Sequence, residues 1–314
     1  MRRSKISDRV ADLRQLASVR RIVLDDGVEQ GVRALAFSTG GGLDFWVLVD
    51  RSLDIGPIWW RGLPVAPQGP TGFQHPRWHR RDAEDGQGFR ASFSGFLVTC
   101  GLEHIRQPAD GHPMHGRLPL TPAVLGGYGA DWALDVPVLY CEGEVVQKHP
   151  GGEHFRLRRR IEADIGGTKL AVRDTVENLA DRRQAQASLY HFNIGYPALD
   201  DGTVVEHAGR RMLGPLRLPD ERASREAFSM AVSDARHATC TISCPKMMVE
   251  LAWDTATLPH LQLWHDLSPG ACVLSIEPCT SERLPGGRSG CEPMLAPDGT
   301  RTYALDISIR ENSG

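Results

Sequence analysis

The sequence predicts an all-β protein, a large antiparallel β domain preceded by one short helix. Three observations support this fold class. The chain has 33 glycines and 21 prolines among 314 residues. The combined share of glycine and proline in the chain exceeds the roughly 12% that average usage gives for the pair, so turns should join many short segments. Apolar and polar residues alternate along most of these segments, as in strands with one buried face. No linker or shift in composition divides the chain, which indicates a single domain.

The N-terminus is the expected exception to the β pattern. Ser7 and Asp8 can cap a helix that continues to about Ala17. The apolar side chains of this segment recur at helical spacing, at Val10, Leu13 and Leu16. We therefore expect residues 1–19 to form a helical extension and residues 20–314 to form one β-sandwich domain.

Short strands are expected in chain order after this helix. The first four lie at 20–24, 32–37, 43–49 and 58–60, at the spacing typical of a sandwich or barrel. The middle of the chain alternates most clearly, with strands at 136–146, 154–163 and 169–178 and a tight hairpin at Gly166-Gly167. Further strands are expected at 89–102, 186–190, 204–207, 240–244, 247–253, 261–263, 272–276 and 301–309. Two short helices are expected at 128–132 and 224–228.

Two long segments, 64–88 and 107–120, lose the strand pattern. Both are rich in proline, glycine and histidine and contain few apolar positions. Loops of this length are uncommon in a compact domain unless they serve a function. We expect them to border a binding site.

Composition and charge exclude several classes of protein. A net charge of -3 and 41% hydrophobic residues argue against a nucleic-acid partner and against disorder. No apolar segment approaches the roughly 20 residues that cross a bilayer, and the charged N-terminus lacks the apolar core of a secretory signal. The sequence therefore predicts a cytoplasmic protein with no membrane partner.

Cysteine usage agrees with a reducing compartment. There are seven cysteines, an odd number at irregular spacing, and most lie in apolar segments, which favours buried reduced thiols. Cys240 and Cys244 lie in a strand-like segment that places both on one face. We interpret this pair as structural rather than as a zinc or redox site.

Two polar residues interrupt apolar β segments: His191 in SLYHFNIG and Glu277 in VLSIEP. An unpaired buried charge is costly, so such residues are either satisfied in the core or functional. Burial raises the pKa of a carboxyl group towards neutrality, where histidine already titrates. A histidine and a glutamate facing one cavity could therefore act as an acid/base pair. The alternative is a satisfied core histidine and a glutamate at a strand end.

Other candidate residues lie near the expected loops. A histidine-rich segment contains Glu103, His104, His112 and His115. These residues could bind a metal ion, although their spacing matches no tight metal motif. Neutral histidine also suits sugar hydroxyls, because it carries one donor and one acceptor.

A further pair, Arg51 and Asp54, follows the apolar segment at 43–49. Polar residues at the end of a buried strand can face a ligand. A surface ion pair is the alternative interpretation.

The order of these segments resembles the aldose 1-epimerase, or galactose mutarotase-like, superfamily, and most closely its branch described only as a domain of unknown function. The matching segments are VDRSLDIGPIWWRGLPVA, SGFLVTCGLEH, PMHGR, LAVRDTVENLADRRQ, SLYHFNIGYP and VLSIEP. They extend from about residue 20 to 310. The resemblance implies a β-supersandwich of antiparallel sheets with a carbohydrate cleft on one face.

The resemblance also assigns roles to residues. In that superfamily a histidine is the general acid and a glutamate the general base. His191 matches the acid, since it follows the TVEN hairpin, and Glu277 matches the base in the late EP strand. Polar contacts to the sugar are expected from Arg51, Asp54, His104, His115, Arg117, Asn193 and His265. Stacking is expected from Trp59, Trp60, Trp78 or Trp264.

The implied reaction is exchange of sugar anomers without a cofactor. Glu277 would take the proton of the anomeric hydroxyl and His191 would give one to the ring oxygen. The ring would then open, turn about C1–C2 and close on the other face. Arginines near the site would suit an acidic sugar.

Two alternatives from other classes stay open at this point. One is a non-catalytic carbohydrate-binding protein that keeps the fold. The other is a metal-dependent sugar isomerase or lyase that uses the histidine-rich segment together with His265. The identity of the sugar and the oligomeric state are also open, with a homodimer as one option.

Overall fold

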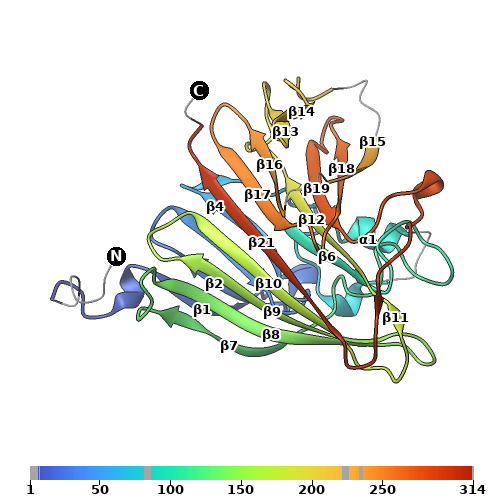
Figure 1. Ribbon diagram of the computed structural model, residues 1–314. Coiled ribbons are helices and arrows are strands. Elements are labelled where there is room, and N and C mark those ends of the chain that lie inside the picture. The colour runs from blue at the N-terminus through green and yellow to red at the C-terminus, as the bar shows by residue number, and fades with distance from the viewer. Residues whose placement is uncertain (1–5, 7, 81–85, 221–225, 233–235, 313–314) are drawn as a thin grey trace.

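The computed structural model describes residues 6, 8–80, 86–220, 226–232 and 236–312 (Figure 1). Strands dominate this part of the chain, and its helices are short. The described strands form two five-stranded sheets, one nine-stranded sheet and a two-stranded ribbon, and the neighbouring strands in them pair antiparallel. The predicted all-β fold class is confirmed.

The first five-stranded sheet follows the chain order. It consists of β1 (Ser18–Val23), β2 (Arg33–Ser38), β3 (Leu43–Leu48), β4 (Asp54–Trp60) and β5 (Leu63–Pro64). Alternate residues of β2 and β3 are buried, and Phe37 stacks on Phe45 with ring centroids 4.5 Å apart. Strands this short suffice because each is paired on the sheet and covered on one face.

The nine-stranded sheet is the largest element of the fold. Its order is β14 (Arg210–Leu213), β13 (Val204–His207), β16 (His237–Ser243), β17 (Met248–Asp254), β21 (Thr300–Arg310), β10 (Lys169–Asn178), β9 (His154–Asp164), β8 (Val138–Lys148) and β7 (Val124–Asp131). In β9, the apolar side chains and one arginine, Arg159, face inward, and the other side chains face outward. Gly166, with a φ of +76°, allows the predicted tight turn between β9 and β10.

The second five-stranded sheet has the order β15 (Glu226–Ala231), β18 (His260–Asp266), β19 (Val273–Cys279), β12 (Ala187–Ile194) and β6 (Leu97–Leu102). All residues of β12 and β19 are buried, which shows that both faces of this sheet are covered at its centre. The ribbon pairs β11 (Gln184–Ala185) with β20 (Met294–Leu295). The one α-helix that the described residues contain is α1 (Gln87–Ala91).

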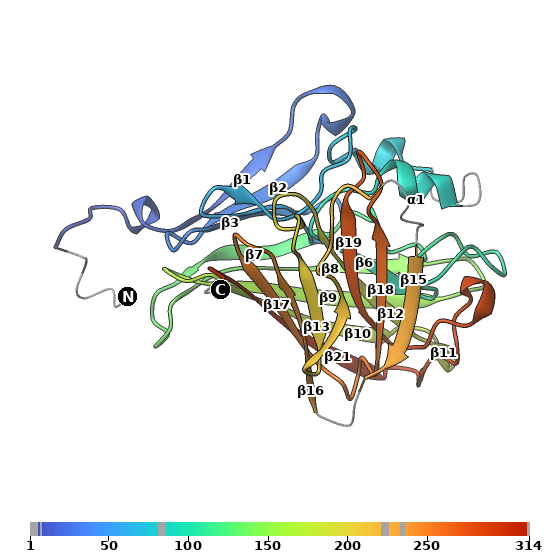
Figure 2. The same ribbon diagram turned by 90° about the horizontal axis from the view of Figure 1, so that it is seen from above.

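The two five-stranded sheets pack against the same face of the nine-stranded sheet (Figure 2). The main core contains buried side chains from all three sheets, such as Phe45, Ile161 and Phe192. A smaller apolar cluster covers the opposite face of β6, β12 and β19. Its buried members are Phe89, Cys100, Ile105, Met114, Ala187, Leu189 and Cys279.

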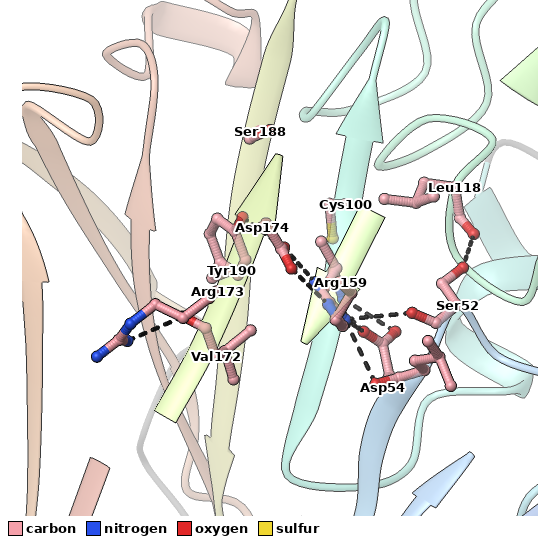
Figure 3. Close-up of polar contacts among 12 residues, drawn as sticks. Ser52, Asp54, Cys100, Leu118, Arg159, Val172, Arg173, Asp174, Ser188 and Tyr190 are labelled. Carbon is pink, nitrogen blue, oxygen red and sulfur yellow. Dashed lines mark hydrogen bonds and ion pairs between the residues drawn. The ribbon is translucent and has the colours of Figure 1, made fainter. Parts of the chain in front are cut away.

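A buried arginine joins the three sheets (Figure 3). Arg159 of β9 is 1% exposed and forms ion pairs with Asp54 of β4 at 2.8 Å and with Asp174 of β10 at 2.7 Å. It also donates to Thr99 Oγ1 of β6 at 2.8 Å, and the Tyr190 hydroxyl of β12 donates to Asp174 at 2.7 Å. A buried charge is tolerated when its partners satisfy it. These interactions therefore link the three sheets across the core.

The predicted N-terminal helix is wrong where the structure describes it. Residues 8–17 contain only the 3-10 helix Leu13–Gln15. The carboxylate of Asp12 accepts from the backbone N–H of Arg14 at 2.9 Å and so caps this single turn. The apolar side chains that recur at helical spacing in this segment are only partly buried, so packing does not stabilise a longer helix before the strand begins at Ser18.

Two other helix predictions fail because strand pairing overrides local preference. Residues 128–132 largely belong to β7, which pairs with β8. Residues 226–228 belong to β15, which pairs with β18, and the rest of that predicted helix lies outside the described residues. The expected strand at 89–102 is correct only from Leu97, because its first residues form the end of α1.

The expectation of reduced thiols fits the structure for most cysteines. All seven cysteines are free, and Cys272 and Cys291 are the two that are not buried. Burial raises the pKa of the Cys240 thiol to about 12. None of the helices in the described part of the chain is long and apolar enough to cross a membrane.

Candidate functional site

The predicted acid/base pair meets on one face of the second five-stranded sheet. β12 and β19 are antiparallel neighbours, and their register sets His191 beside Glu277. His191 Nε2 lies 3.4 Å from Glu277 Oε1, and the two side chains are 5% and 0% exposed. On the other side of β19, Gln262 of β18 is the strand partner of Glu277, and its amide donates to Glu277 Oε2. Three polar side chains therefore form a row across three strands.

The orientation of the His191 ring is set by Asn193, two residues further along the same face. Its Nδ1 lies 2.5 Å from Asn193 Oδ1. The Asn193 amide donates to the carbonyl of Gly95 at 2.9 Å, and the Ser275 hydroxyl donates to Asn193 Oδ1 at 2.9 Å. Because Oδ1 is an acceptor, Nδ1 must carry a proton, and Nε2 is left to exchange one beside Glu277.

Aromatic side chains surround His191. Its ring centroid lies 5.2 Å from that of Phe93, 5.5 Å from His115, 6.3 Å from Trp264 and 6.4 Å from Phe89. Phe89 belongs to α1, so this helix covers part of the site. Phe93 and Trp264 are themselves half-buried, whereas His191 and Glu277 are buried.

His115 faces the pair in a neutral form. Burial, followed by the charges of His191 and Arg106, lowers the pKa of His115 well below its usual value. Its Nδ1 lies 3.2 Å from the carbonyl oxygen of Ile105 and therefore donates to it. The Nε2 of His115 is then an acceptor suited to a ligand hydroxyl.

The neutral state of His115 predicts a pH dependence of stability. In the unfolded chain this histidine would gain a proton near pH 6.5, whereas in the folded protein it would not. Stability should therefore be lost as the pH falls below about 6.5, by at most about 1.4 kcal/mol per pH unit from this group. Urea unfolding of wild type and His115→Gln between pH 7 and 5 measures the difference. Parallel pH dependences for the two proteins would contradict the assignment.

Asp54 belongs to the buried junction around Arg159 and not to the row of His191, Glu277 and Gln262. Its carboxylate accepts from Thr99 and Arg159, and burial raises its pKa to about 6. Thr99 is the strand partner of Tyr190, whose side chain joins the buried junction, whereas His191 points to the other face. The structure therefore separates Asp54 from His191 by the thickness of the sheet.

Arg51 lies next to the C-terminal end of α1. Its Nη2 donates to the carbonyl of Ser92 at 2.5 Å, and its guanidinium lies over the ring of Phe73. Burial lowers the pKa of Arg51 to about 10. A void of about 10 Å³ borders Arg51, Phe93 and Val98, which is room for about one water molecule. Arg51 thus supports the segment that carries Phe93 without itself contacting the acid/base pair.

The histidine-rich segment is divided among separate contacts. Arg117 Nη1 pairs with Glu103 at 3.2 Å and with Glu153 at 3.5 Å. His104 Nε2 lies 2.6 Å from the carbonyl of Gln107, and burial lowers its pKa. Over the described ranges, no group of three or more histidine, cysteine or acidic side chains could hold a metal ion. The geometry of these side chains therefore favours a structural role for His104 and Arg117.

His265 lies on the opposite face of β18 from the row of His191, Glu277 and Gln262. Side chains alternate along a strand, and Gln262 and Trp264 both face His191 and Glu277. His265, between Trp264 and Asp266, is the strand partner of Leu274 in the main core. The structure thus gathers His191, Glu277, His115 and Asn193 from the predicted site but not His265. Among the predicted stacking residues, Trp264 is at the site.

Buried polar atoms without a hydrogen-bond partner gather on this same face. Of the nine such atoms found among the described residues, five belong here: Glu277 Oε1, Gln262 Oε1, His260 Nδ1, and Nε and Nη1 of Arg106. Native proteins rarely leave buried polar atoms unpaired, and such atoms commonly mark functional positions. Gln262, His260 and Arg106 were not predicted. The polar residues at every second position in β18 signal the first two, but Arg106 lies in a loop and carries no such signal.

Comparison with known proteins gives a family and a fold. A family model described as Domain of unknown function (DUF4432) matches residues 29–309. No curated protein matches the sequence. Among solved structures, the chain is similar to a protein of Klebsiella pneumoniae provisionally named an aldose 1-epimerase. The TM-score is 0.84 and the identity 18%, over 100% of this chain and 87% of that one.

Two further solved structures are similar over most of their length. A galactose mutarotase-like protein of Clostridium acetobutylicum has a TM-score of 0.65 and 12% identity, over 94% of this chain and 98% of that one. The galactose 1-epimerase of Lactobacillus acidophilus has a TM-score of 0.59 and 11% identity, over 94% of this chain and 99% of that one. Identities this low establish a shared fold, the β-sandwich that the sequence predicts.

Proposed function

The chain belongs to the family described as Domain of unknown function (DUF4432), and from that premise we propose that it is a sugar 1-epimerase. Such an isomerase exchanges the two anomers of a sugar by opening and closing its ring. Solved structures that share the fold carry the names aldose 1-epimerase and galactose 1-epimerase. Those names supply the class of reaction, and the site supplies the reason to apply it to this chain.

One observation carries the proposal: the contact of 3.4 Å between His191 Nε2 and Glu277 Oε1, both on buried side chains. The Glu277 oxygen in this contact has no hydrogen-bond partner among the described residues. Anomer exchange needs one group that accepts a proton and one that donates a proton, close together and shielded from water. The pair meets these requirements with its own side chains.

The site residues divide the reaction between them. Glu277 takes the proton of the anomeric hydroxyl while His191 Nε2 gives a proton to the ring oxygen, so the C1–O5 bond breaks and an aldehyde forms. Rotation about C1–C2 exposes the other face, and the two proton transfers run in reverse to close the ring. His115 accepts a hydrogen bond from a sugar hydroxyl, and Trp264 offers an apolar ring surface.

The direct test is anomer exchange followed by saturation-transfer NMR, with purified protein and a panel of neutral and acidic sugars. We expect faster exchange of at least one sugar than in buffer alone. A protein that binds a sugar by calorimetry but accelerates exchange of none would instead be a carbohydrate-binding protein, and the proposal would fail.

Asn193 is expected to act as a positioning residue for His191. Asn193→Ala removes the acceptor of the His191 Nδ1 proton, and groups that orient a histidine in this way are worth about 10–100-fold where they have been measured around metal-binding histidines. We expect a loss of that order in kcat. Asn193→Asp keeps the acceptor and adds a negative charge, which favours protonated histidine. Its rate profile should therefore shift to higher pH, and an unshifted profile would argue for a merely structural role.

A further inference from the structure

Arg106 lies at the end of the catalytic face, in the loop that follows β6. Its guanidinium is buried, and Nη2 donates to the carbonyl of Ser281 at 2.7 Å and contacts Cys279 Sγ at 3.4 Å. Cys279 is two residues from Glu277 on the same face of β19. Two strand residues span about 6.6 Å, which is on the scale of a sugar ring with its exocyclic group.

The backbone around Arg106 ties it to the site on both sides. Its carbonyl accepts from the N–H of His115 at 2.9 Å. The next residue, Gln107, donates its N–H to the carbonyl of Gly287 at 3.3 Å. The loop that carries Arg106 therefore lies between the neutral histidine of the site and the segment after β19.

The Arg106 guanidinium has hydrogen-bond donors that are not used. Its Nε and Nη1 have no hydrogen-bond partner in the part of the chain that the structure describes. Burying a charge costs several kcal/mol unless partners satisfy it, and leaving donors unpaired adds to that cost. A guanidinium in this state is suited to the oxygens of a carboxylate, sulfonate or phosphate.

The surrounding charges point the same way. Arg283, half-buried in the segment after β19, has its pKa lowered first by burial and then by the charge of Arg106. The carboxylate of Glu292 is bonded instead to the hydroxyls of Thr280 and Ser281, at 2.6 and 2.5 Å. The charge of Glu277 also acts on Arg283, and the Glu277 carboxylate accepts from Gln262. Neither carboxylate bonds to Nε or Nη1 of Arg106 in the described chain, so these donors are suited to an anionic ligand.

We propose that the site takes a sugar that bears an anionic group, and that Arg106 is the specificity-determining residue that binds this group. This inference rests on the proposed epimerase function, since it assumes that the side chains around His191 and Glu277 bind a sugar. It goes beyond that function by naming the substrate class. The anomeric carbon would lie over Glu277 and the anionic substituent would reach towards Arg106.

The test is calorimetric binding of four sugars that differ in one substituent: glucose, glucuronate, glucose 6-phosphate and 6-deoxy-6-sulfoglucose. We expect at least one anionic sugar to bind wild type 10-fold or more tightly than glucose, and the set distinguishes the three anions. In Arg106→Met this ratio of affinities should fall at least 10-fold. Arg288→Met, which alters an exposed arginine nearby, should keep the ratio.

The outcomes separate this inference from the proposed function. Wild type without preference for any anion overturns the inference, whatever the exchange rates are. Arg106-dependent binding of an anionic sugar without anomer exchange supports the inference and overturns the epimerase function. If circular dichroism shows that Arg106→Met does not fold, Arg106→Lys serves in its place. It keeps the charge but loses the paired donors of the guanidinium, so the ratio of affinities should fall. An unchanged ratio would count against Arg106.

Discussion

Glu277→Gln should lower the rate of anomer exchange by about 10²–10⁴-fold, the usual worth of a positioned general base. The amide has nearly the same shape as the carboxylate and can still accept from Gln262, so the row across β12, β19 and β18 should persist. It cannot take the proton of the anomeric hydroxyl. Saturation-transfer NMR on the sugar that wild type exchanges fastest measures the loss.

The same substitution should leave the protein as stable as wild type or more stable. Glu277 is fully buried, and one of its oxygens has no hydrogen-bond partner in the described chain, so removing its charge removes a desolvation cost. Urea unfolding measures this. Glu282→Gln, an exposed glutamate in the next segment, is the matched control and should keep the wild-type rate. A Glu277→Gln protein that is fully active would disprove the role of this residue.

Arg159→Met should destabilise the protein by about 3–5 kcal/mol, because it leaves two carboxylates buried without their cation. Asp54 and Asp174 lie 2.8 and 2.7 Å from Arg159 and are themselves buried. The effect should shrink as the pH falls towards about 5. Burial already raises the pKa of Asp54 to about 6, and loss of the arginine, which lowers it, raises it further. Protonation of Asp54 then removes its charge. Urea unfolding at pH 5 and 7 measures both effects.

Two further variants separate the effect of unpaired charge from the effect of packing. Arg158→Met alters the exposed neighbour, whose pairs with Glu144 and Glu177 are at the surface, and it should cost less than about 1 kcal/mol. The triple variant Arg159→Met, Asp54→Asn, Asp174→Asn removes all three charges and should recover much of the lost stability. If the single and triple variants are equally unstable, the loss comes from packing and not from unpaired charge.

The strands of the fold could be predicted where one face of the sheet is buried. Alternation in β9 and β10 is clear because most inward residues are apolar and most outward residues are charged, with Arg159 and Asp174 as buried exceptions. The same rule fails at the edges. β7 is an edge strand with no fully buried residue, so no apolar alternation there marks the segment as a strand. The N-terminal helix failed because its apolar side chains, Val10, Leu13 and Leu16, are only partly buried, which their spacing does not reveal.

The site could be predicted only in part. A strand has two faces, and the sequence alone does not show which face is turned towards the site. His191 and Glu277 stand out as polar residues in apolar strands, and they do meet. Asp54 and His265 stand out in the same way, but the register turns each of them away from the pair. Arg106 is the opposite case. It lies in a loop, and its importance follows from tertiary burial alone.

The two faces of β12 limit where residues can be inserted into or deleted from this protein as its sequence evolves. Tyr190 serves the buried junction and His191, the next residue, serves the site on the other face. Insertion or loss of one residue within β12 would exchange the two faces, disabling both stability and chemistry in one step. The turn after β13, where Gly209 has open space, carries no such penalty. Related proteins should therefore vary in length at turns of this kind while the span from Ala187 to Ile194 keeps its eight residues.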